Sequence, residues 1–495
     1  MTQRLSERVA TGIVGLDLIL DQGFPRNRMY LIQGDPGSGK TTLALQFLLE
    51  GVRLGEKVLH ITLSETSEEL QSVAVSHGWS IDRINTYELA AIEESLKLDN
   101  LQTIFPPSEV ELNQTTQKLL AECERVQPQR VVFDSLAEMR LLAQSALRYR
   151  RQILSLKHYF AGRNCTVLLL DDRTSGEGDI HVQSLAHGVL ELEQKLPDYG
   201  AERRRLRVVK LRAVKFTGGY HDFHIRTGGI VVHPRVNTEV DFKPVPVEQF
   251  PSANTQLDTM LHGGMERGTS VLLIGPAGAG KSTVAVQYAA AAAARNEKSM
   301  LFSFEEGPGT LFRRSKGIGI DLEKICADGS LRIKHLKPAS LSPGQFTETV
   351  REAVEKEKSG LLIIDSLNGY LNAVNDERFV AVHLRDLLTW LAHRNVLTIM
   401  IVAQQGMIGQ MQSPIDVSYL ADTVLLFRYF EYAGRVRKAL SVVKKRSGEH
   451  ETTIRELGIT SEGIKIGSAL EDFHGVLTGV PTFKGAATEL LRKTS

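Results

Sequence analysis

The sequence GDPGSGKT at residues 34–41 and its counterpart GPAGAGKS at residues 275–282 decide the fold of this chain. Both fit G-x-x-x-x-G-K-[ST]. Each follows an apolar run that predicts a strand and precedes a helical pattern, which spans residues 42–51 in the first copy. The glycines let successive backbone N–H groups wrap around phosphate, and the N-terminus of the following helix adds a favourable dipole. Two complete copies in this context predict two sites for nucleotide phosphates.

Each phosphate loop also supplies a lysine for the β- and γ-phosphates and a hydroxyl for Mg²⁺. The predicted ligand of both loops is therefore ATP with Mg²⁺. The residues expected to contact it are Gly37, Ser38, Gly39, Lys40, Thr41 and Thr42 in the first copy, and Gly278, Ala279, Gly280, Lys281, Ser282 and Thr283 in the second.

A repeat runs through the chain. Motifs around the first loop return at a constant offset of 241 residues, and later motifs return at offsets of 231 and 234, which short loop deletions explain. The matched pairs are Leu16-Asp17 with Leu257-Asp258, Gly39-Lys40 with Gly280-Lys281, Glu65 with Glu306, Asp134-Ser135 with Asp365-Ser366, and Lys210-x-Arg212 with Lys444-x-Arg446. A proline-rich stretch predicts a linker over residues 235–250. We therefore expect domains over residues 1–234 and 251–470, and a tail over residues 471–495.

Short apolar runs alternate with helical patterns in both copies, and continuous apolar runs are typical of strands covered on both faces. The expected strands span residues 29–33, 58–63, 130–133 and 166–170, then 270–274, 299–304, 361–364 and 397–402. The sequence thus predicts an α/β protein: two tandem RecA-like P-loop NTPase domains with mostly parallel central sheets.

Two aspartates end apolar strands downstream of the loops. Asp134 and Asp365 are each followed by serine, which is the placement of a carboxylate that orients Mg²⁺ through its water shell. A strand-end aspartate is usually a turn former, but the shared placement in both copies favours the metal role. With the hydroxyls of Thr41 and Ser282, these aspartates form the predicted metal residues.

Hydrolysis also needs a carboxylate that positions and deprotonates the attacking water. The second copy offers Glu305 and Glu306 at the end of the strand that follows the loop helix. The first copy offers Ser64 and Glu65 at this position, and Ser64 corresponds to Glu305. The first copy is therefore either a differently tuned ATPase or a non-catalytic scaffold whose state is controlled by bound nucleotide.

Two basic pairs, Lys210 with Arg212 and Lys444 with Arg446, lie late in each copy, too far along the chain to belong to their own phosphate loop. A cation inserted from a neighbouring subunit stabilises charge on the transferring phosphoryl group, and this arrangement requires a ring. The alternative is an exposed strand with alternating charges.

Composition excludes several classes of protein. A chain of 495 residues suits two domains, and 59 basic against 58 acidic residues leave a formal charge of +1, without a global basic field for nucleic acid. The N-terminus has no apolar segment, and the apolar run at residues 288–294 is too short to span a bilayer, so we expect a cytoplasmic protein without membrane contact. Cys123, Cys165 and Cys326 form no C-x-x-C pair, which predicts core or surface thiols.

The sequence resembles the KaiC family of double-domain circadian-clock ATPases over almost its whole length. The resemblance rests on TGIVGLD at residues 11–17, the paired loops, FEE at residues 304–306, the two Asp-Ser strand ends, and K-x-R-x-x-x-H at Lys444, Arg446 and His450. It implies a double-ring homohexamer with ATP and Mg²⁺ between protomers, the last three residues facing the next subunit's γ-phosphate, and a KaiB-like or other signalling partner. Phe216 replaces the histidine in the first copy.

Residues 416–423 look like the region of this family that carries adjacent Ser-Thr phosphorylation sites, but here the pair reads Ser418-Tyr419. The resemblance therefore implies serine/threonine autokinase activity on Ser418 alone. An ordinary loop serine in a pure ATPase is the alternative.

The rival function is that of a RecA- or RadA-like DNA-dependent ATPase. Arg148, Arg150 and Arg151, with the glycine-containing loops at residues 172–178 and 404–412, support it. The neutral charge, the lack of interleaved aromatic and basic residues in those loops, and the absence of a cysteine-rich zinc module argue against it, so we expect no nucleic-acid partner.

Overall fold

The computed structural model describes residues 7–63, 65–88, 107–143, 145–173, 178–196, 201–236, 248–338, 341–372, 377–404, 417–478 and 482–483. Ser64, much of the predicted linker and most of the predicted tail lie outside these residues, as do parts of the two loops considered for nucleic acid. The chain divides into two compact units, Met1–Arg235 and Val236–Ser495.

The first unit is built on a nine-stranded sheet with the order β11-β10-β9-β8-β3-β7-β6-β4-β5. Neighbouring strands from β8 to β5 are parallel, and β9, β10 and β11 extend the sheet in antiparallel fashion. The strands are β3 (Met29–Gly34), β4 (Val58–Thr62), β5 (Asn85–Glu88), β6 (Arg130–Asp134), β7 (Thr166–Asp172), β8 (Gly188–Lys195), β9 (Arg203–Leu211), β10 (Tyr220–Arg226) and β11 (Gly229–His233). β1 (Arg8–Val9) and β2 (Phe24–Pro25) form a small separate sheet.

The second unit repeats this plan with the order β16-β15-β17-β18-β14-β19-β20-β21-β22, parallel from β16 to β19 and antiparallel beyond. Its strands are β14 (Ser270–Gly275), β15 (Ser299–Ser303), β16 (Leu331–His335), β17 (Leu361–Asp365), β18 (Leu397–Ala403), β19 (Thr423–Tyr432), β20 (Arg435–Lys445), β21 (Arg455–Thr460) and β22 (Gly463–Ala469). The short pairs are β12 (Gln249–Phe250) with β13 (Met265–Glu266), and β23 (Phe473–His474) with β24 (Thr482–Phe483). The predicted fold class of two RecA-like α/β domains with mostly parallel sheets is confirmed.

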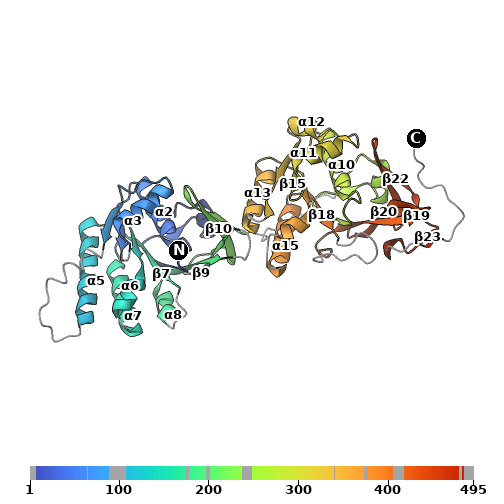
Figure 1. The fold of residues 1–495 in the computed structure, drawn as a ribbon. Coiled ribbons are helices and arrows are strands. Elements are labelled where there is room, and N and C mark those ends of the chain that lie inside the picture. The colour runs from blue at the N-terminus through green and yellow to red at the C-terminus, as the bar shows by residue number, and fades with distance from the viewer. Residues whose placement is uncertain are drawn as a thin grey trace, which may run out of the picture. The chain divides into compact units, whose positions relative to one another are not determined.

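Helices cover both faces of each sheet (Figure 1). Those of the first unit are α1 (Val14–Ile19), α2 (Lys40–Arg53), α3 (Ser67–Ser76), α5 (Pro107–Val126), α6 (Leu136–Ala143), α7 (Ala146–Phe160) and α8 (Gly178–Leu185). Those of the second are α9 (Thr255–Met260), α10 (Lys281–Ala294), α11 (Pro308–Lys316), α12 (Leu322–Ala327), α13 (Pro343–Glu355), α14 (Leu367–Asn372), α15 (Glu377–Ala392) and the 3₁₀ turn η2 (Val476–Thr478). None of the helices within the described ranges is both long enough and apolar enough to cross a bilayer.

The apolar strands owe their burial to this double cover. In β3, Tyr30 and Ile32 pack into the core under α1, α2 and α3, and Met29 and Leu31 pack into the core under α5 to α8. Alternate side chains of a strand point to opposite faces, so both must be apolar here. Cys123 and Cys165 are buried in the second of these cores, and burial raises the pKa of the Cys123 thiol to about 12.

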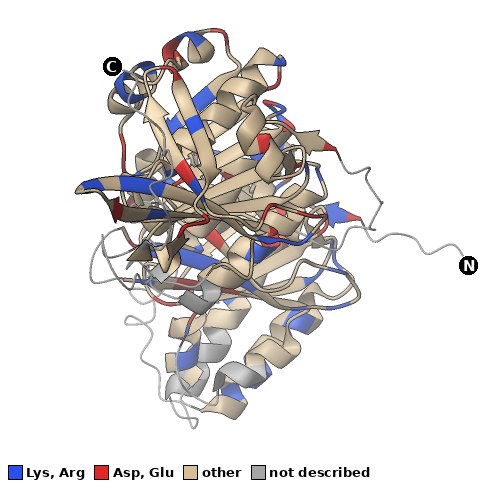
Figure 2. Cartoon of the chain, turned by 90° about the vertical axis from the view of Figure 1, so that its right-hand side faces the viewer, with Lys and Arg blue, Asp and Glu red and all other residues tan. Residues whose placement is uncertain are grey.

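The antiparallel extension differs in character. β9 reads RRRLRVVKL, and two of its arginines pair with glutamates of β8: Arg205 with Glu193 at 2.7 Å and Arg207 with Glu191 at 2.6 Å. Lys210 belongs to this charged strand. Figure 2 shows acidic positions interspersed with basic ones along the chain, rather than one uniformly basic stripe.

One buried ion pair ties α2 to the sheet of the first unit. The side chain of Arg130 at the start of β6 is 1% exposed and pairs with Glu56, whose side chain is 9% exposed. Its Nη1 donates to the carbonyls of Ala10 at 2.8 Å and Phe47 at 2.7 Å, and the guanidinium lies 4.6 Å from the Phe47 ring centroid. Arg130 thereby fixes the chain before α1 and the middle of α2.

Replacement of Glu56 by glutamine should leave the buried Arg130 charge uncompensated and lower the free energy of unfolding of the first unit by about 3–5 kcal/mol. The matched control is Glu124→Gln, which breaks an ion pair with Arg163 whose side chains are 65% and 50% exposed, and should cost under about 1 kcal/mol. Urea denaturation followed by circular dichroism measures both. Equal losses in the two variants would contradict the assigned role of Arg130.

Candidate nucleotide sites

Both phosphate loops lie at the carboxyl edge of the parallel strands, where ligand sites of open α/β sheets are found. β3 ends at Gly34 and α2 begins at Lys40; β14 ends at Gly275 and α10 begins at Lys281. The helix-capping glycines Gly39 and Gly280 have φ of 99° and 109°, in the left-handed region that favours glycine. This conformation turns the chain into the helix, so that its first N–H groups face the loop.

The two loop lysines fold back over their own loops. Lys40 Nζ donates to the carbonyls of Gly34 at 3.0 Å and Asp35 at 3.1 Å, and Lys281 Nζ donates to those of Gly275 at 2.8 Å and Pro276 at 2.6 Å. Both side chains are buried. Burial lowers the pKa of Lys281 to about 8, against the opposing effect of Asp365 and Glu305. Phosphate oxygens bind such a buried ammonium more strongly than carbonyl oxygens do, because both partners are charged.

The predicted metal residues meet in both units. Thr41 Oγ1 donates to Asp134 Oδ2 at 2.8 Å, and in the second unit Ser282 lies close to Asp365. Burial raises the pKa of Asp365, and the nearby Ser282 side chain opposes that shift. Mg²⁺ takes one or two protein oxygen ligands together with water and phosphate oxygens, so a hydroxyl beside a buried carboxylate fits this ion.

The two glutamates of the second unit point to different partners. Ser366, which follows the metal aspartate, donates its hydroxyl to Glu305 Oε1 at 2.5 Å, so Glu305 lies beside the predicted metal residues. Glu306 forms an ion pair with Arg314 of α11 at 2.8 Å. Both carboxylates act on the predicted metal site, since, besides burial, the charges of Glu306 and Glu305 each raise the pKa of Asp365, and Glu306 differs in being paired with Arg314.

The first unit has Glu65 in the place of Glu306. Glu65 Oε2 has no hydrogen-bond partner among the described residues, and burial, followed by the nearby charge of Asp134, raises the pKa of its carboxyl. Val73 stands where the second unit has Arg314. Glu65 is thus not held away from its site by an arginine at that position.

The basic pairs lie at the other edge of each sheet. Lys444 is opposite Val424 near the start of β19, and β19 begins beside the start of β14. Lys444 Nζ donates to the carbonyls of Ser418 at 3.0 Å and Ala421 at 2.7 Å. The structure therefore separates this lysine from the phosphate loop of its own unit by the length of β14, which at six residues spans about 20 Å.

The remaining basic residues follow the same pattern. Arg446 donates to the Tyr419 carbonyl at 2.7 Å and pairs with Asp422 at 3.1 Å, and His450 lies in the loop after β20. In the first unit, Lys210 donates to the Gln183 carbonyl at 2.7 Å and Arg212 to that of Ser184 at 3.0 Å. Phe216 packs against the apolar core and supplies no cation.

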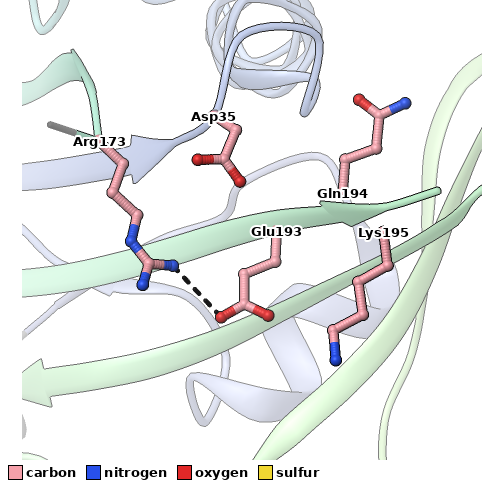
Figure 3. Close-up of a pocket in the computed structure, with 5 residues that line it drawn as sticks. All are labelled: Asp35, Arg173, Glu193, Gln194 and Lys195. Carbon is pink, nitrogen blue, oxygen red and sulfur yellow. Dashed lines mark hydrogen bonds and ion pairs between the residues drawn. The ribbon is translucent and has the colours of Figure 1, made fainter. Parts of the chain in front are cut away.

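A pocket of about 560 Å³ adjoins the first loop (Figure 3). Asp35 of the loop overhangs it, and Arg173 reaches from the end of β7 toward Glu193 of β8, at 3.4 Å; Gln194 and Lys195 complete the lining. In the second unit Tyr429 of β19 instead donates its hydroxyl to the Ala277 carbonyl of the loop at 3.0 Å. The surroundings of the two loops therefore differ.

Sequence reasoning missed one charged residue at the first loop. Asp172 Oδ1, at the end of β7, lies 2.8 Å from Lys40 Nζ. The signal was present, because the apolar run TVLLLDD ends in carboxylates just as the strand before Ser135 does. Ser366 and Arg314, the partners of the two glutamates, were also missed.

A family model described as "ATPase: KaiC" matches the chain twice, over residues 9–237 and 251–471. The chain belongs to the KaiC family of ATPases. The predicted membership is thus confirmed. The chain is similar to the circadian clock protein KaiC3 of Synechocystis sp. at 24% identity, covering 96% of this chain and 95% of that protein. It is 25% identical to the circadian clock oscillator protein KaiC of Thermostichus vulcanus, with 96% and 92% covered, and 26% identical to KaiC2 of Synechocystis sp., with 95% and 83% covered.

Proposed function

We propose that this KaiC-family ATPase binds ATP with Mg²⁺ at both phosphate loops and assembles into homohexameric rings, in which a neighbouring copy completes each site. The supporting observation is that the phosphate loop and the basic pair lie at opposite edges of the sheet in both units. Each unit has its phosphate loop at the carboxyl edge and its basic pair at the amino edge. In a head-to-tail arrangement the loop edge of one copy meets the basic edge of the next copy. Such an arrangement closes into a ring when a whole number of equal rotations between copies completes a full turn.

The chain's own residues account for hydrolysis at the second site. Mg²⁺, when bound, neutralises charge on the β- and γ-phosphates. Lys281 binds the phosphates, and Ser282 and Asp365 hold the metal. Glu305, fixed by the Ser366 hydroxyl, orients and deprotonates the attacking water. Lys444 and Arg446 of a neighbouring copy, with His450, stabilise the transferring phosphoryl group.

The first site has a different set of groups. Ser64 and Phe216 replace a carboxylate and a histidine, while Glu65 and the Lys210–Arg212 pair are retained. We propose that the first site binds nucleotide and hydrolyses it more slowly than the second, so that it contributes mainly to assembly. A KaiB-like or other signalling partner would then read the nucleotide state of the ring.

The DNA-dependent alternative receives less support from the structure. Arg205 and Arg207 of the most basic strand are paired with glutamates of β8, and these pairs partly neutralise the charge that would bind phosphates of a nucleic acid.

Glu305→Gln should lower ATP turnover at the second site by about 10²–10⁴-fold, because a carboxamide cannot accept the proton of the attacking water. Glu306→Gln is the matched control and should have a much smaller effect, since Glu306 is held by Arg314. Both changes are made in a chain whose first loop is intact, so that assembly is retained, and the phosphate release of a Lys281→Ala chain is subtracted to give the turnover of the second site. A larger loss in Glu306→Gln would show that the two glutamates have been assigned the wrong way round.

We also propose that Ser418 accepts a phosphoryl group from ATP bound to a neighbouring copy. Ser418 lies just before β19, at the same edge as Lys444, and its carbonyl accepts a hydrogen bond from that lysine. It therefore faces a neighbour's phosphates wherever Lys444 does. Tyr419 is 44% exposed and lies 5.6 Å below the Arg385 guanidinium, and its ring places the hydroxyl far from the backbone, so an ordered two-site cycle is not expected.

With γ-labelled ATP, the wild-type chain should incorporate label that Ser418→Ala removes, because in-line transfer depends on the position of the acceptor oxygen. Ser461→Ala, at an exposed turn between β21 and β22, should retain the label. Peptide mapping locates it. Absence of label from the wild type, or undiminished label in Ser418→Ala, would leave ATP hydrolysis as the only chemistry.

A further inference from the structure

We infer that Asp172 is an internal competitor for nucleotide phosphate at the first site: it binds Lys40, and ATP must displace it. This inference rests on the proposed function, because it presumes that the first loop binds nucleotide. It makes Asp172 a determinant of affinity that the second site lacks.

The position of Asp172 follows from strand register. β7 runs parallel to β3, and Asp172 is the residue directly beside Gly34, where the phosphate loop begins. Its Oδ1 lies 2.8 Å from Lys40 Nζ, and the two side chains are 38% and 9% exposed. A charge-assisted contact of this length occupies the ammonium that the β- and γ-phosphates require.

The second unit has a methyl group at the equivalent position. β18 runs parallel to β14, and Ala403 is the residue beside Gly275. Lys281 keeps the same two carbonyl acceptors as Lys40, and within the described ranges it forms no ion pair. The difference between the two lysines is therefore the carboxylate of Asp172, and the chain contains its own control.

The two glutamates of β8 near the first loop are paired with arginines. Glu191 pairs with Arg173 at 2.7 Å and with Arg207 at 2.6 Å, and Glu193 pairs with Arg205 at 2.7 Å. Asp172 instead forms an ion pair with Lys40 of the loop. A bound phosphate must therefore displace the Asp172 carboxylate from Lys40, and the carboxylate repels the phosphate if it stays nearby.

The size of the effect follows from the exposure of the pair. A partly exposed ion pair contributes about 1 kcal/mol or less, and repulsion of the phosphates adds to this. Removal of the carboxylate should therefore tighten nucleotide binding at the first site roughly three- to tenfold. The exchange therefore lowers the affinity of the first site for nucleotide.

The test uses the full-length chain with one site disabled. A Lys281→Ala chain reports the first site. In this chain, the dissociation constant of a fluorescent ADP analogue is measured with Asp172 unchanged, with Asp172→Ala and with the isosteric Asp172→Asn. In a Lys40→Ala chain, which reports the second site, Ala403 is compared with Ala403→Asp. Every titration is run with Mg²⁺ and again with EDTA, and circular dichroism checks that each variant is folded.

The inference predicts a three- to tenfold lower dissociation constant for both Asp172 variants, with and without Mg²⁺, and a higher one for Ala403→Asp. Unchanged affinity in folded Asp172→Asn overturns it. If the Asp172 variants bind the analogue more weakly with Mg²⁺ but not with EDTA, the inference is also overturned, and Asp172 is a metal ligand instead. If the Lys281→Ala chain binds no analogue at all, the proposed first nucleotide site fails together with the inference.

Discussion

The approach of a hydroxyl on the first turn of the loop helix to a carboxylate at the end of a nearby strand is the constraint on which both sites depend. It joins Thr41 to Asp134 by a hydrogen bond of 2.8 Å and places Ser282 close to Asp365. The carboxyl ends of parallel strands lie at one edge, so a short glycine-rich loop brings the two groups together. A buried carboxylate is costly without a partner, and the hydroxyl and a bound cation supply one.

Much of the fold was predictable because its decisive parts are local. Eight of the parallel strands were predicted to within two residues from continuous apolar runs, which reflect cover on both faces, whereas the parallel strands β5, β8, β16 and β19 were not predicted. The antiparallel strands β9 and β20 carry alternating charges, and their place in the sheet was not predicted from that pattern. Contacts such as those of Asp172, Ser366 and Arg314 also escaped prediction, because they depend on which strand lies beside which and not on spacing along the chain.

The two units use one plan for two unequal sites. In the second, Ser366 holds Glu305 beside Asp365, and Lys281 is desolvated without an ion pair in the described part of the chain. In the first, Asp172 contacts Lys40. The same edge geometry thus surrounds the two loop lysines with different charged groups. In both units the basic pair lies at the edge of the sheet opposite to the phosphate loop.

Electron cryomicroscopy of the chain with Mg²⁺ and a non-hydrolysable ATP analogue tests this account most directly. The account predicts closed rings with the analogue at both loops, each γ-phosphate facing the basic pair of the adjacent copy: Lys210 and Arg212 in one ring, and Lys444 and Arg446 in the other. Particles that remain single chains with filled loops, or rings whose basic pairs face solvent, would contradict it.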